Sequence, residues 1–384
     1  MSTFGCNVVK VDDVLKHPNA DRLDIVKIGD FNCVVNRNDD GSVRYSRGDY
    51  VVYVPEASVI PDHVLKDIGF WDTTKDRGML SGSGYNRVKA IKLRGVLSQG
   101  IVVPLTFDAD DNICICVGNM GEKPVKLGQD VSEFLGIVKY EPPIPQNMAG
   151  DVWRLPEFAY HFDIDNIKKH PSLFTEGEMV WISEKIHGTF MNITVHNKEI
   201  GEFAFGKNKN ITVTSKGLLL TGLFLKNCET NRIRNVYVRK LLQLLEDKGD
   251  RLDCLPANSY TICGELFGGS IQDLKYGLDK QQQFRIFDVF ADRSPLSLND
   301  MVTQADRMGF SKDEIVPILA IGQYSREMLD GLVDGNTTLN SAGHIREGVV
   351  VKPITERRDN RLGRVMAKHI SEAYLLRKDA TEFT

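Results

Sequence analysis

Residues 185–189 read Lys-Ile-His-Gly-Thr and place a lysine just before a potential tight turn. The glycine at position 188 allows the backbone to bend sharply behind the lysine. Apolar residues flank the motif, with Trp181 before it and Phe190 after it. A lysine attacks only as a neutral amine, and its ordinary pKa of about 10.4 is lowered by burial and by neighbouring cations. The motif therefore suits a nucleophilic Lys185, and a surface lysine in a turn between strands is the alternative.

Further short motifs follow along the chain and carry residue types suited to phosphate chemistry. A transferring phosphoryl group needs fixed positive charge around its oxygens, which lysines supply. A carboxylate at the end of an apolar strand is unfavourable unless it is paired or hydrated. The face of a phenylalanine can stack on any purine. The residues concerned are Lys216 in Ser-Lys-Gly, Glu265 in Gly-Glu, Phe287 in Phe-Asp, Glu347 in Glu-Gly, and Lys368.

This ordered set resembles the covalent nucleotidyltransferase superfamily, in which a lysine attacks the α-phosphate of a nucleoside triphosphate. DNA ligases and capping enzymes usually carry aspartate where this chain has His187, so the motif is most similar to the nick-sealing branch of the ATP-dependent RNA ligases. The resemblance implies that Lys185, with Gly188 beside the nucleotide, takes AMP from ATP. AMP then passes to an RNA 5′-phosphate, and a 3′-OH attacks to form the phosphodiester.

The same resemblance implies roles for the residues of the later motifs. His187 and Lys368 join Lys185 as catalytic residues, with His187 orienting a phosphate or the attacking RNA end. Lys216 stands where the family commonly has arginine and faces phosphate, as does Lys352. Glu265 binds the ribose hydroxyls. Phe287 stacks on the adenine, although a core phenylalanine is the alternative.

The resemblance also implies a divalent cation, Mg²⁺ or Mn²⁺, held by Glu347 directly or through water. The last motif departs from the family pattern, which often has Lys-x-Lys. This chain keeps only the second lysine, Lys368, and has Met366 in place of the first. Arg364 or His369 are candidates to replace the missing charge.

The likeliest domain boundary is a proline-rich stretch at residues 141–150, which predicts an extended linker. Residues 151–384 would form the adenylyltransferase domain, built of antiparallel sheets and helices. Residues 1–140 contain several short apolar runs typical of strands, such as residues 50–54, and predict a small β-barrel of the OB-fold type. The fold class predicted for the whole chain is therefore α+β.

A second resemblance supports the N-terminal assignment. Residues 17–29, 48–52 and 93–100 are similar to segments of the tRNA-binding OB domains attached to some synthetases. In DNA ligases and capping enzymes an OB domain follows the catalytic domain, whereas here the OB-like segment precedes it. This order is similar to a subgroup of RNA ligases with an N-terminal OB domain.

The net charge of −4 leaves little general attraction for RNA, so binding must come from local basic surfaces. The densest basic stretch of the first domain holds Arg87, Lys89, Lys92 and Arg94. We expect it to meet RNA, because an OB-fold binds nucleic acid on its strands and loops. The alternative is a solvated strand edge whose charges prevent aggregation.

In the second domain, alternating apolar residues predict a strand at 191–195, and helical spacing predicts an amphipathic helix from Asn231 to Glu246. Ser297 begins a capping box that predicts a helix toward Met308. Apolar runs at 284–290 and 349–351 predict buried strands.

Bulk properties agree with a cytoplasmic or nuclear protein. No apolar stretch is long enough to span a membrane, and the N-terminus does not resemble a signal peptide. The seven scattered cysteines suit structural or incidental roles. We expect a monomer that acts on nicked duplex RNA or an RNA/DNA hybrid. The alternatives are a guanylyltransferase or DNA ligase of the same superfamily, and a non-catalytic OB-type RNA-binding protein.

Overall fold

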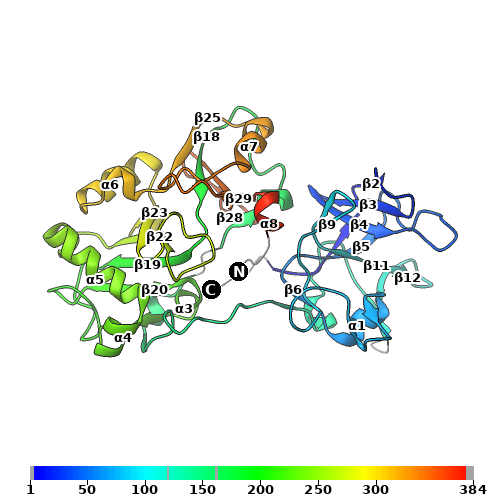
Figure 1. The fold of residues 1–384 in the computed structure, drawn as a ribbon, viewed down its shortest axis with the longest axis horizontal. Coiled ribbons are helices and arrows are strands. Elements are labelled where there is room, and N and C mark those ends of the chain that lie inside the picture. Colours follow the sequence, from blue (N-terminus) through cyan, green and yellow to red (C-terminus); the bar gives the residue numbers. More distant parts are fainter. Residues whose placement is uncertain (1–3, 119–120, 161–162, 378–384) are drawn as a thin grey trace. The chain divides into compact units, whose positions relative to one another are not determined.

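The computed structural model describes residues 4–118, 121–160 and 163–377, and the chain divides into two compact units. The division falls between Glu141 and Pro142, and the short segment 168–171 is grouped with the N-terminal unit. Blue and cyan ribbons in Figure 1 mark most of the N-terminal unit, and green to red ribbons mark the C-terminal unit. No helix among the described residues is long and apolar enough to cross a membrane.

The N-terminal unit is built from short antiparallel strands around a core that lies on both faces of its central strand, β5 (Tyr50–Val54). Val52 and Val54 point into one apolar cluster, and Val51 and Tyr53 into another. This alternation explains why the whole segment is apolar. The other elements are β1 (Asn7–Lys10) and β11 (Ile101–Pro104) beside β5; a sheet of β2 (Asp13–Lys16), β3 (Leu23–Ile28) and β4 (Phe31–Asn36); the pairs β9 (Ile91–Leu93) with β10 (Val96–Ser98), β6 (Ser58–Val59) with β15 (Val138–Lys139), and β7 (Trp71–Asp72) with β8 (Arg77–Gly78); β12 (Thr106–Phe107), β13 (Ile113–Cys116) and β14 (Glu122–Pro124); and helices α1 (Asp62–Asp67) and α2 (Ser132–Leu135).

The C-terminal unit contains two five-stranded sheets, named here by their middle strands. The β26 sheet has the order β17 (Asp165–Asn166), β29 (Ala367–Ile370), β26 (Gly348–Pro353), β18 (Met179–Lys185) and β25 (Ile318–Gln323). The β22 sheet has the order β20 (Ile211–Ser215), β19 (Thr189–Val195), β22 (Tyr260–Gly268), β23 (Gln282–Ala291) and β24 (Ser294–Pro295). Two smaller pairs are β16 (Val152–Arg154) with β21 (Leu223–Leu225), and β27 (Arg358–Asp359) with β28 (Gly363–Arg364).

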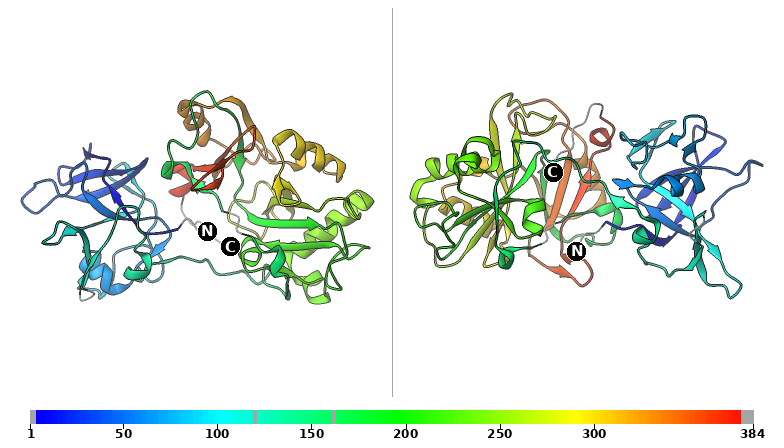
Figure 2. Two further views of the ribbon diagram at one scale, coloured as in Figure 1. Left: turned by 180° about the vertical axis from the view of Figure 1, so that it is seen from behind. Right: turned by 90° about the horizontal axis from the view of Figure 1, so that it is seen from below.

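Helices cover one face of each sheet. Against the β22 sheet pack α5 (Val236–Lys248) and α6 (Leu298–Arg307), which lie on the same side of it in Figures 1 and 2. Helix α7 (Arg326–Val333) packs against the β26 sheet. The remaining helices are α3 (Lys216–Leu220), α4 (Glu229–Arg234) and α8 (Glu372–Leu375).

The predicted α+β class is confirmed, as are most of the predicted elements. The predicted helix start at Ser297 is confirmed as an N-cap, because its side chain accepts a hydrogen bond from the backbone N–H of Asp300 at the start of α6, but the reciprocal bond of a capping box is not formed between these two described residues. The single helix predicted for residues 231–246 was wrong, because the structure has α4 and α5 with a break at Asn235. The Asn235 side chain accepts hydrogen bonds from the backbone of Tyr237 and Val238, and so begins a new helix.

Candidate active site

The predicted nucleophile lies where the chain passes from one sheet to the other. Strand β18 ends at Lys185 in the β26 sheet, and β19 begins at Thr189 in the β22 sheet, so the turn of residues 186–188 joins the two sheets. A side chain at Gly188 would place its Cβ 2.3 Å from the carbonyl oxygen of Leu266. Only glycine fits at this close approach to β22, so packing explains the glycine of the motif.

Lys185 forms an ion pair with a carboxylate of the neighbouring strand. Its backbone pairs with Gly348, and its Nζ lies 2.7 Å from Oε1 of Glu347, the residue before that glycine. Burial lowers the pKa of Lys185, but the charges of Glu347 and Glu265 outweigh burial and hold the pKa above its ordinary value. The sequence had suggested a lowered pKa, so this arrangement holds an ammonium that must lose a proton before it attacks.

A second carboxylate lies in the same place, on the β22 sheet. Glu265 pairs in register with Phe190, one residue after the start of β19. The pKa of Glu265 is raised to about 8, chiefly by burial and also by the charge of Glu347, while Lys185 and Lys216 oppose the shift. Glu347 and Glu265 thus bring carboxylate oxygens to one place, and hard divalent cations such as Mg²⁺ or Mn²⁺ prefer oxygen ligands.

Lys368 joins this cluster from β29. It pairs with Val350, two residues along β26 from the partner of Lys185. Burial, together with the charge of Lys185, lowers the pKa of Lys368 to about 8. Lys216, the first residue of α3, acts on the same groups and binds Asp163 with its Nζ 2.9 Å from Oδ1. The structure therefore brings Lys185, Lys216, Glu265, Glu347 and Lys368 together.

Lys352 does not reach this cluster. It pairs with Trp181, four residues along β18 from Lys185, which corresponds to about 13 Å of strand. Its side chain is buried, with Nζ 2.9 Å from Oδ2 of Asp288 and 2.8 Å from the carbonyl oxygen of Phe287. Arg364 binds the same Asp288 carboxylate with two nitrogens. Lys352 is thus part of a buried ion network.

Phe287 occupies a β-bulge. The register between β22 and β23 shifts at this point, since Cys263 pairs with Asp288 while Gly264 pairs with Ile286. Phe287 is the extra residue, and bulges commonly redirect a side chain next to a functional site. Its ring packs against Phe190 with centroids 5.9 Å apart, on the sheet face opposite the helices. An aromatic surface thus lies beside the Glu265 strand.

The imidazole of His187 is held on both sides by protein groups. Its Nε2 lies 2.8 Å from Oδ1 of Asp273, and its Nδ1 lies 2.8 Å from the hydroxyl of Tyr374. Arg377 binds the same Asp273. The sequence did not mark these three partners, because they lie 86 or more residues from His187 and belong to no recognisable motif.

Neither candidate for replacing the charge missing at Met366 takes that place. Arg364 is held by Asp288 and by Glu356, with Nε 2.8 Å from Oε2 of the glutamate. His369 lies 3.5 Å from Asp330 through its Nδ1. It sits next to Lys368 in β29, so its side chain points to the other face of the sheet.

The four basic residues predicted to bind RNA divide into two kinds in the N-terminal unit. Arg87 is partly buried, and its guanidinium stacks 3.6 Å from the ring centroid of Tyr140. Lys89 is also partly buried. Lys92 and Arg94 are exposed at the hairpin of β9 and β10. Of the four predicted residues, the two on the hairpin are therefore the ones exposed to solvent.

The His-Pro-Asn turn of the sequence supports this hairpin. His17 Nε2 lies 3.1 Å from the carbonyl oxygen of Leu93, and the side-chain amide of Asn19 donates to the carbonyl of Arg94 at 3.0 Å. The buried His17 therefore holds the tip from which Arg94 projects.

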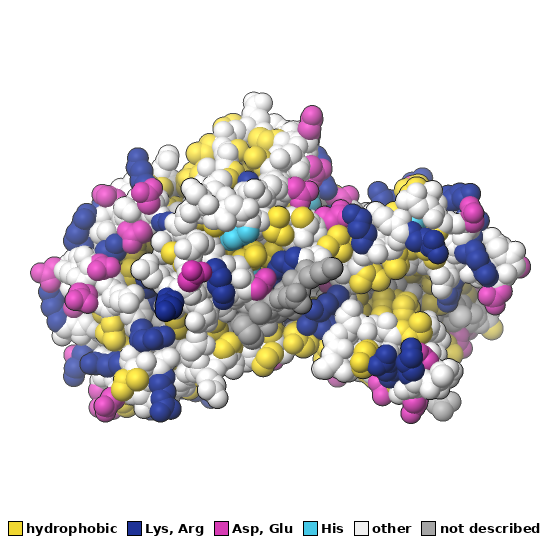
Figure 3. All heavy atoms as spheres, in the orientation of Figure 1, with side chains coloured by type: hydrophobic (Ala, Val, Ile, Leu, Met, Phe, Trp, Pro, Cys, Tyr) yellow, Lys and Arg dark blue, Asp and Glu magenta, His cyan; other side chains and the backbone are white. Residues whose placement is uncertain are grey.

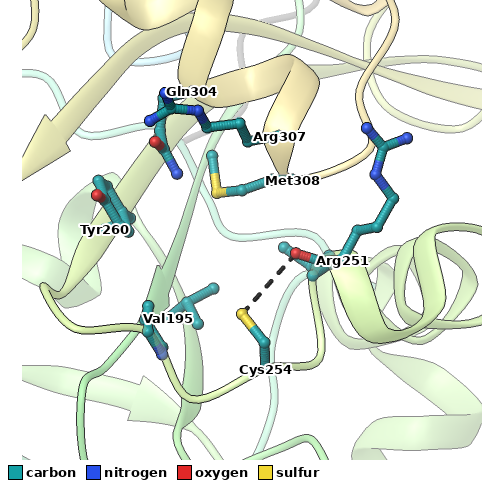
Figure 4. A pocket seen from close by; sticks show the side chains of 9 residues that line it. Val195, Arg251, Cys254, Tyr260, Gln304, Arg307 and Met308 are labelled. Atoms are coloured by element: carbon teal, nitrogen blue, oxygen red, sulfur yellow. Dashed lines mark hydrogen bonds between the residues drawn. The ribbon is translucent and has the colours of Figure 1, made fainter.

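A cavity of about 150 Å³ lies at the far end of the β22 sheet from the turn (Figure 4). It is bordered by Val195 at the end of β19 and Tyr260 at the start of β22, with Arg307 and Met308 from the end of α6. None of the predicted site residues lines it.

Comparison with protein families identifies the C-terminal unit. The family model described as RNA ligase matches residues 178–370, about half of the chain. The chain belongs to the RNA ligase family. A model of an OB-fold domain matches residues 6–105. The family inferred from the ordered motifs is therefore confirmed, and so is the N-terminal OB-fold region. A comparison with curated protein sequences found no match.

Solved structures of the RNA ligase of Naegleria gruberi share this fold. A variant with AMP and Mn has a TM-score of 0.70 at 23% identity, and the alignment covers 96% of this chain and 97% of that one. The complex of the same protein with pyrophosphate has a TM-score of 0.69 at 23% identity, again over 96% and 97%. A variant with ATP and Mn has a TM-score of 0.67 at 23% identity over the same shares. The likeness extends through both units.

Proposed function

We propose that this family member is an ATP-dependent RNA ligase that joins a 3′-OH to a 5′-phosphate through a lysine–AMP intermediate at Lys185. Its substrate would be a nick in duplex RNA or in an RNA/DNA hybrid. The observation that carries the proposal is the contact of Lys185 with Glu347 at 2.7 Å, in a cluster that includes Glu265 and Lys368. A chain of this family with a nucleophile, two carboxylates and a second, partly buried lysine in one place suits nucleotidyl transfer.

Each member of the cluster has a part in the proposed first step. Lys185 loses its proton and attacks the α-phosphate, forming a nitrogen–phosphorus bond as pyrophosphate leaves. Lys368 and Lys216 neutralise the phosphate oxygens, and the lowered pKa of Lys368 reflects a buried cation that an anion would stabilise. Glu265 accepts hydrogen bonds from the ribose, and Phe287 stacks on the adenine beside Phe190.

Glu347 would hold a divalent cation, directly or through water, beside the Lys185 amine that it contacts. When bound there, Mg²⁺ or Mn²⁺ would supply positive charge to the phosphates. The carboxylates of Glu347 and Glu265 hold the proton on Lys185. A cation that binds these carboxylates would weaken their hold on that proton, and this would favour the neutral amine that the reaction needs. The Naegleria ligase structures contain ATP, AMP, pyrophosphate and Mn, which are the participants of this first step.

The N-terminal unit is proposed to hold the RNA, with residues 1–140 as the OB domain and residues 151–384 as the catalytic domain. Lys92 and Arg94 on the β9–β10 hairpin carry this proposal. Figure 3 shows basic and acidic side chains interspersed over the viewed face, so a local cluster is a better candidate for RNA than a general field. We further propose a monomer that acts in the cytoplasm or nucleus.

Three alternatives are distinct from this proposal. A guanylyltransferase would take GTP in place of ATP, and a DNA ligase would seal nicked DNA in preference to RNA. A non-catalytic RNA-binding protein would form no nucleotide adduct. The histidine of the lysine motif and the position of the OB domain before the catalytic domain favour the RNA ligase.

A sealing assay tests the proposal. Purified protein is given ATP and Mg²⁺ with a nicked RNA duplex, the same nick in DNA, or the two RNA strands without their complement. We expect joining of the nicked RNA, slower joining without the complement, and none by Lys185→Ala. Equal joining of all three substrates would remove the duplex preference, and no joining of any RNA would reject the ligase.

A further inference from the structure

We propose that Tyr374 and Arg377 are positioning residues for lysine adenylation, acting through His187 and Asp273 to fix the turn that follows Lys185. This inference rests on the proposed function, because it concerns the same nucleophile. It differs from the role expected from the sequence, in which His187 itself meets a phosphate or an RNA end. In the structure the side chain of His187 is only 7% exposed, and protein groups contact both ring nitrogens.

The turn needs to be held because the two sheets meet there. Glu347 belongs to the β26 sheet and Glu265 to the β22 sheet, while Lys185 stands at the junction. A small change in the backbone of residues 186–188 would move the amine relative to both carboxylates. In bond-forming steps, a misplacement of about 1 Å can lower the rate about a hundredfold.

One side of the turn is held by the loop that follows β22. The hydroxyl of Tyr276 accepts the backbone N–H of His187 at 2.7 Å, and the side-chain amide of Gln272 donates to the carbonyl of Gly188 at 3.2 Å. Asp273 belongs to the same loop and binds the imidazole. These contacts fix the backbone, but they leave Nδ1 of His187 to another partner.

The C-terminal segment supplies that partner. Asp273 is a carboxylate that accepts from Nε2–H of His187, and the Tyr374 hydroxyl lies 2.8 Å from Nδ1 on the other side of the ring. Arg377 contacts both Asp273 and Tyr374. Its Nε lies 2.9 Å from Oδ2 of Asp273 and its Nη2 lies 3.2 Å from Oδ1, while its guanidinium stacks 3.7 Å from the ring centroid of Tyr374. We call His187, Asp273, Tyr374 and Arg377 the latch, and every polar side-chain atom of these four residues has a partner within it.

The latch continues from the strand that carries Lys368. Strand β29 ends at Ile370, and Ser371 caps α8 by accepting the backbone N–H of Tyr374 at 3.3 Å. The Ser371 hydroxyl in turn donates to Asp334 at 2.7 Å. Lys368, Tyr374 and Arg377 therefore belong to one short segment of the chain, which links the phosphate-facing lysine to the turn that follows the nucleophile.

The test measures the rate and the ATP dependence of lysine–AMP formation in full-length Tyr374→Phe and Arg377→Lys. We expect the rate at saturating ATP to fall about tenfold in each variant, because Tyr374→Phe removes the hydroxyl that pairs with Nδ1 and Arg377→Lys removes the two-pronged contact to Asp273. ATP affinity should stay within twofold of wild type. Matched controls are Tyr45→Phe, a buried tyrosine of the N-terminal unit, and Arg357→Lys, which removes a two-pronged contact to Glu178 outside the site. Both controls should adenylate at the wild-type rate.

A double mutant shows whether Tyr374 acts through His187. If it does, adding Tyr374→Phe to His187→Ala will cause no further loss of rate. Equal additional losses in both backgrounds, wild-type rates in both single variants, or a change in ATP affinity alone would each overturn the proposal. Amide hydrogen exchange of residues 186–189 gives an independent readout, which should accelerate in Tyr374→Phe while the thermal midpoint stays near wild type. Wild-type protein that forms no adduct would instead reject the proposed function, and unchanged exchange would then reject the latch separately.

Discussion

Charge, rather than apolar burial, governs the state of Lys185. Glu347 and Glu265 raise the pKa of Lys185. The pKa of the neighbouring Lys368 is lowered. In the absence of substrate, the charges of the lysines and glutamates in the site are therefore compensated by one another. An incoming triphosphate would find Lys368 already in place and would compete for the partners of the lysines. Such a prearranged field lowers the reorganisation needed during the reaction.

The protonation of Glu265 predicts a pH-dependent stability. Its pKa is about 8 in the folded protein against an ordinary 4.5, so between these values the folded state binds a proton that the unfolded state lacks. Stability from this group is therefore present below about pH 4.5 and is lost as the pH rises through about 8. We expect Glu265→Gln to raise the thermal midpoint by about 2–4 °C at pH 9 and to change it little at pH 5. An equal gain at both pH values would contradict the buried, protonated carboxylate.

Lys352 and Lys368 should respond differently to the same substitution. Lys352→Met removes an ammonium from a buried network with Asp288, so we expect a loss of stability of about 2–4 kcal/mol with little effect on the adenylation rate of the folded fraction. Lys368→Met should leave urea unfolding nearly unchanged, since it removes a desolvated cation, and should lower the adenylation rate more than a hundredfold. The reverse pattern would place Lys352 at the phosphates after all.

Motifs identified most of the cluster residues because the family fixes their order in the chain. They could not separate Lys352 from Lys368, since both lysines lie on the same face of adjacent strands. The separation depends on register, which puts Lys352 opposite Trp181 and Lys185 opposite Gly348. Sequence patterns specify which face a strand residue occupies, but they specify the pairing of strands poorly.

At the scale of elements, a turn and a bulge position the chemistry. The turn of residues 186–188 links the two sheets, and the bulge at Phe287 turns an aromatic ring and a carbonyl out of the regular ladder. The carbonyl then accepts from Lys352, so the bulge is fixed by the ion network behind it. Neither feature has a strong signature in a single sequence, because both depend on partners from distant strands.

The break between α4 and α5 was missed for a similar reason. Apolar spacing continues through it, and only the side chain of Asn235 shows that a second helix begins. Asn235 also donates to the carbonyl of Met148 at 3.0 Å. We expect Asn235→Ala to lower the free energy of unfolding by about 1–2 kcal/mol, measured by urea denaturation. Ser325→Ala, which removes the N-cap of α7, is the matched control and should cost about 1 kcal/mol. A smaller loss at Asn235 than at Ser325 would show that the Met148 contact contributes nothing.

At the scale of the whole molecule, each unit has its own core. The proline-rich stretch marks the division in the sequence, but Met148 near its end is buried in the core of the catalytic unit. Composition can indicate an extended segment, whereas the point at which it docks depends on contacts with residues such as Asn235. A catalytic fragment should therefore begin at Pro142 and keep this docking segment.

Such a fragment separates the two steps of the proposed reaction. Residues 142–384 contain the whole lysine cluster, so we expect lysine–AMP formation within about threefold of the full chain. Sealing of nicked RNA at limiting substrate should fall at least tenfold, because the basic hairpin is lost. A gel assay of both products with both proteins gives the comparison. Equal sealing by fragment and full chain would show that the N-terminal unit does not hold the RNA.

The central claim is that Lys185 carries AMP during catalysis. The most direct measurement incubates the full chain with ATP and Mg²⁺, digests it, and locates the added AMP by mass spectrometry. We expect one modified lysine, Lys185, with no adduct from GTP, none in EDTA and none in Lys185→Ala. An adduct on any other lysine, or one that persists at wild-type level in Lys185→Ala, would contradict the account.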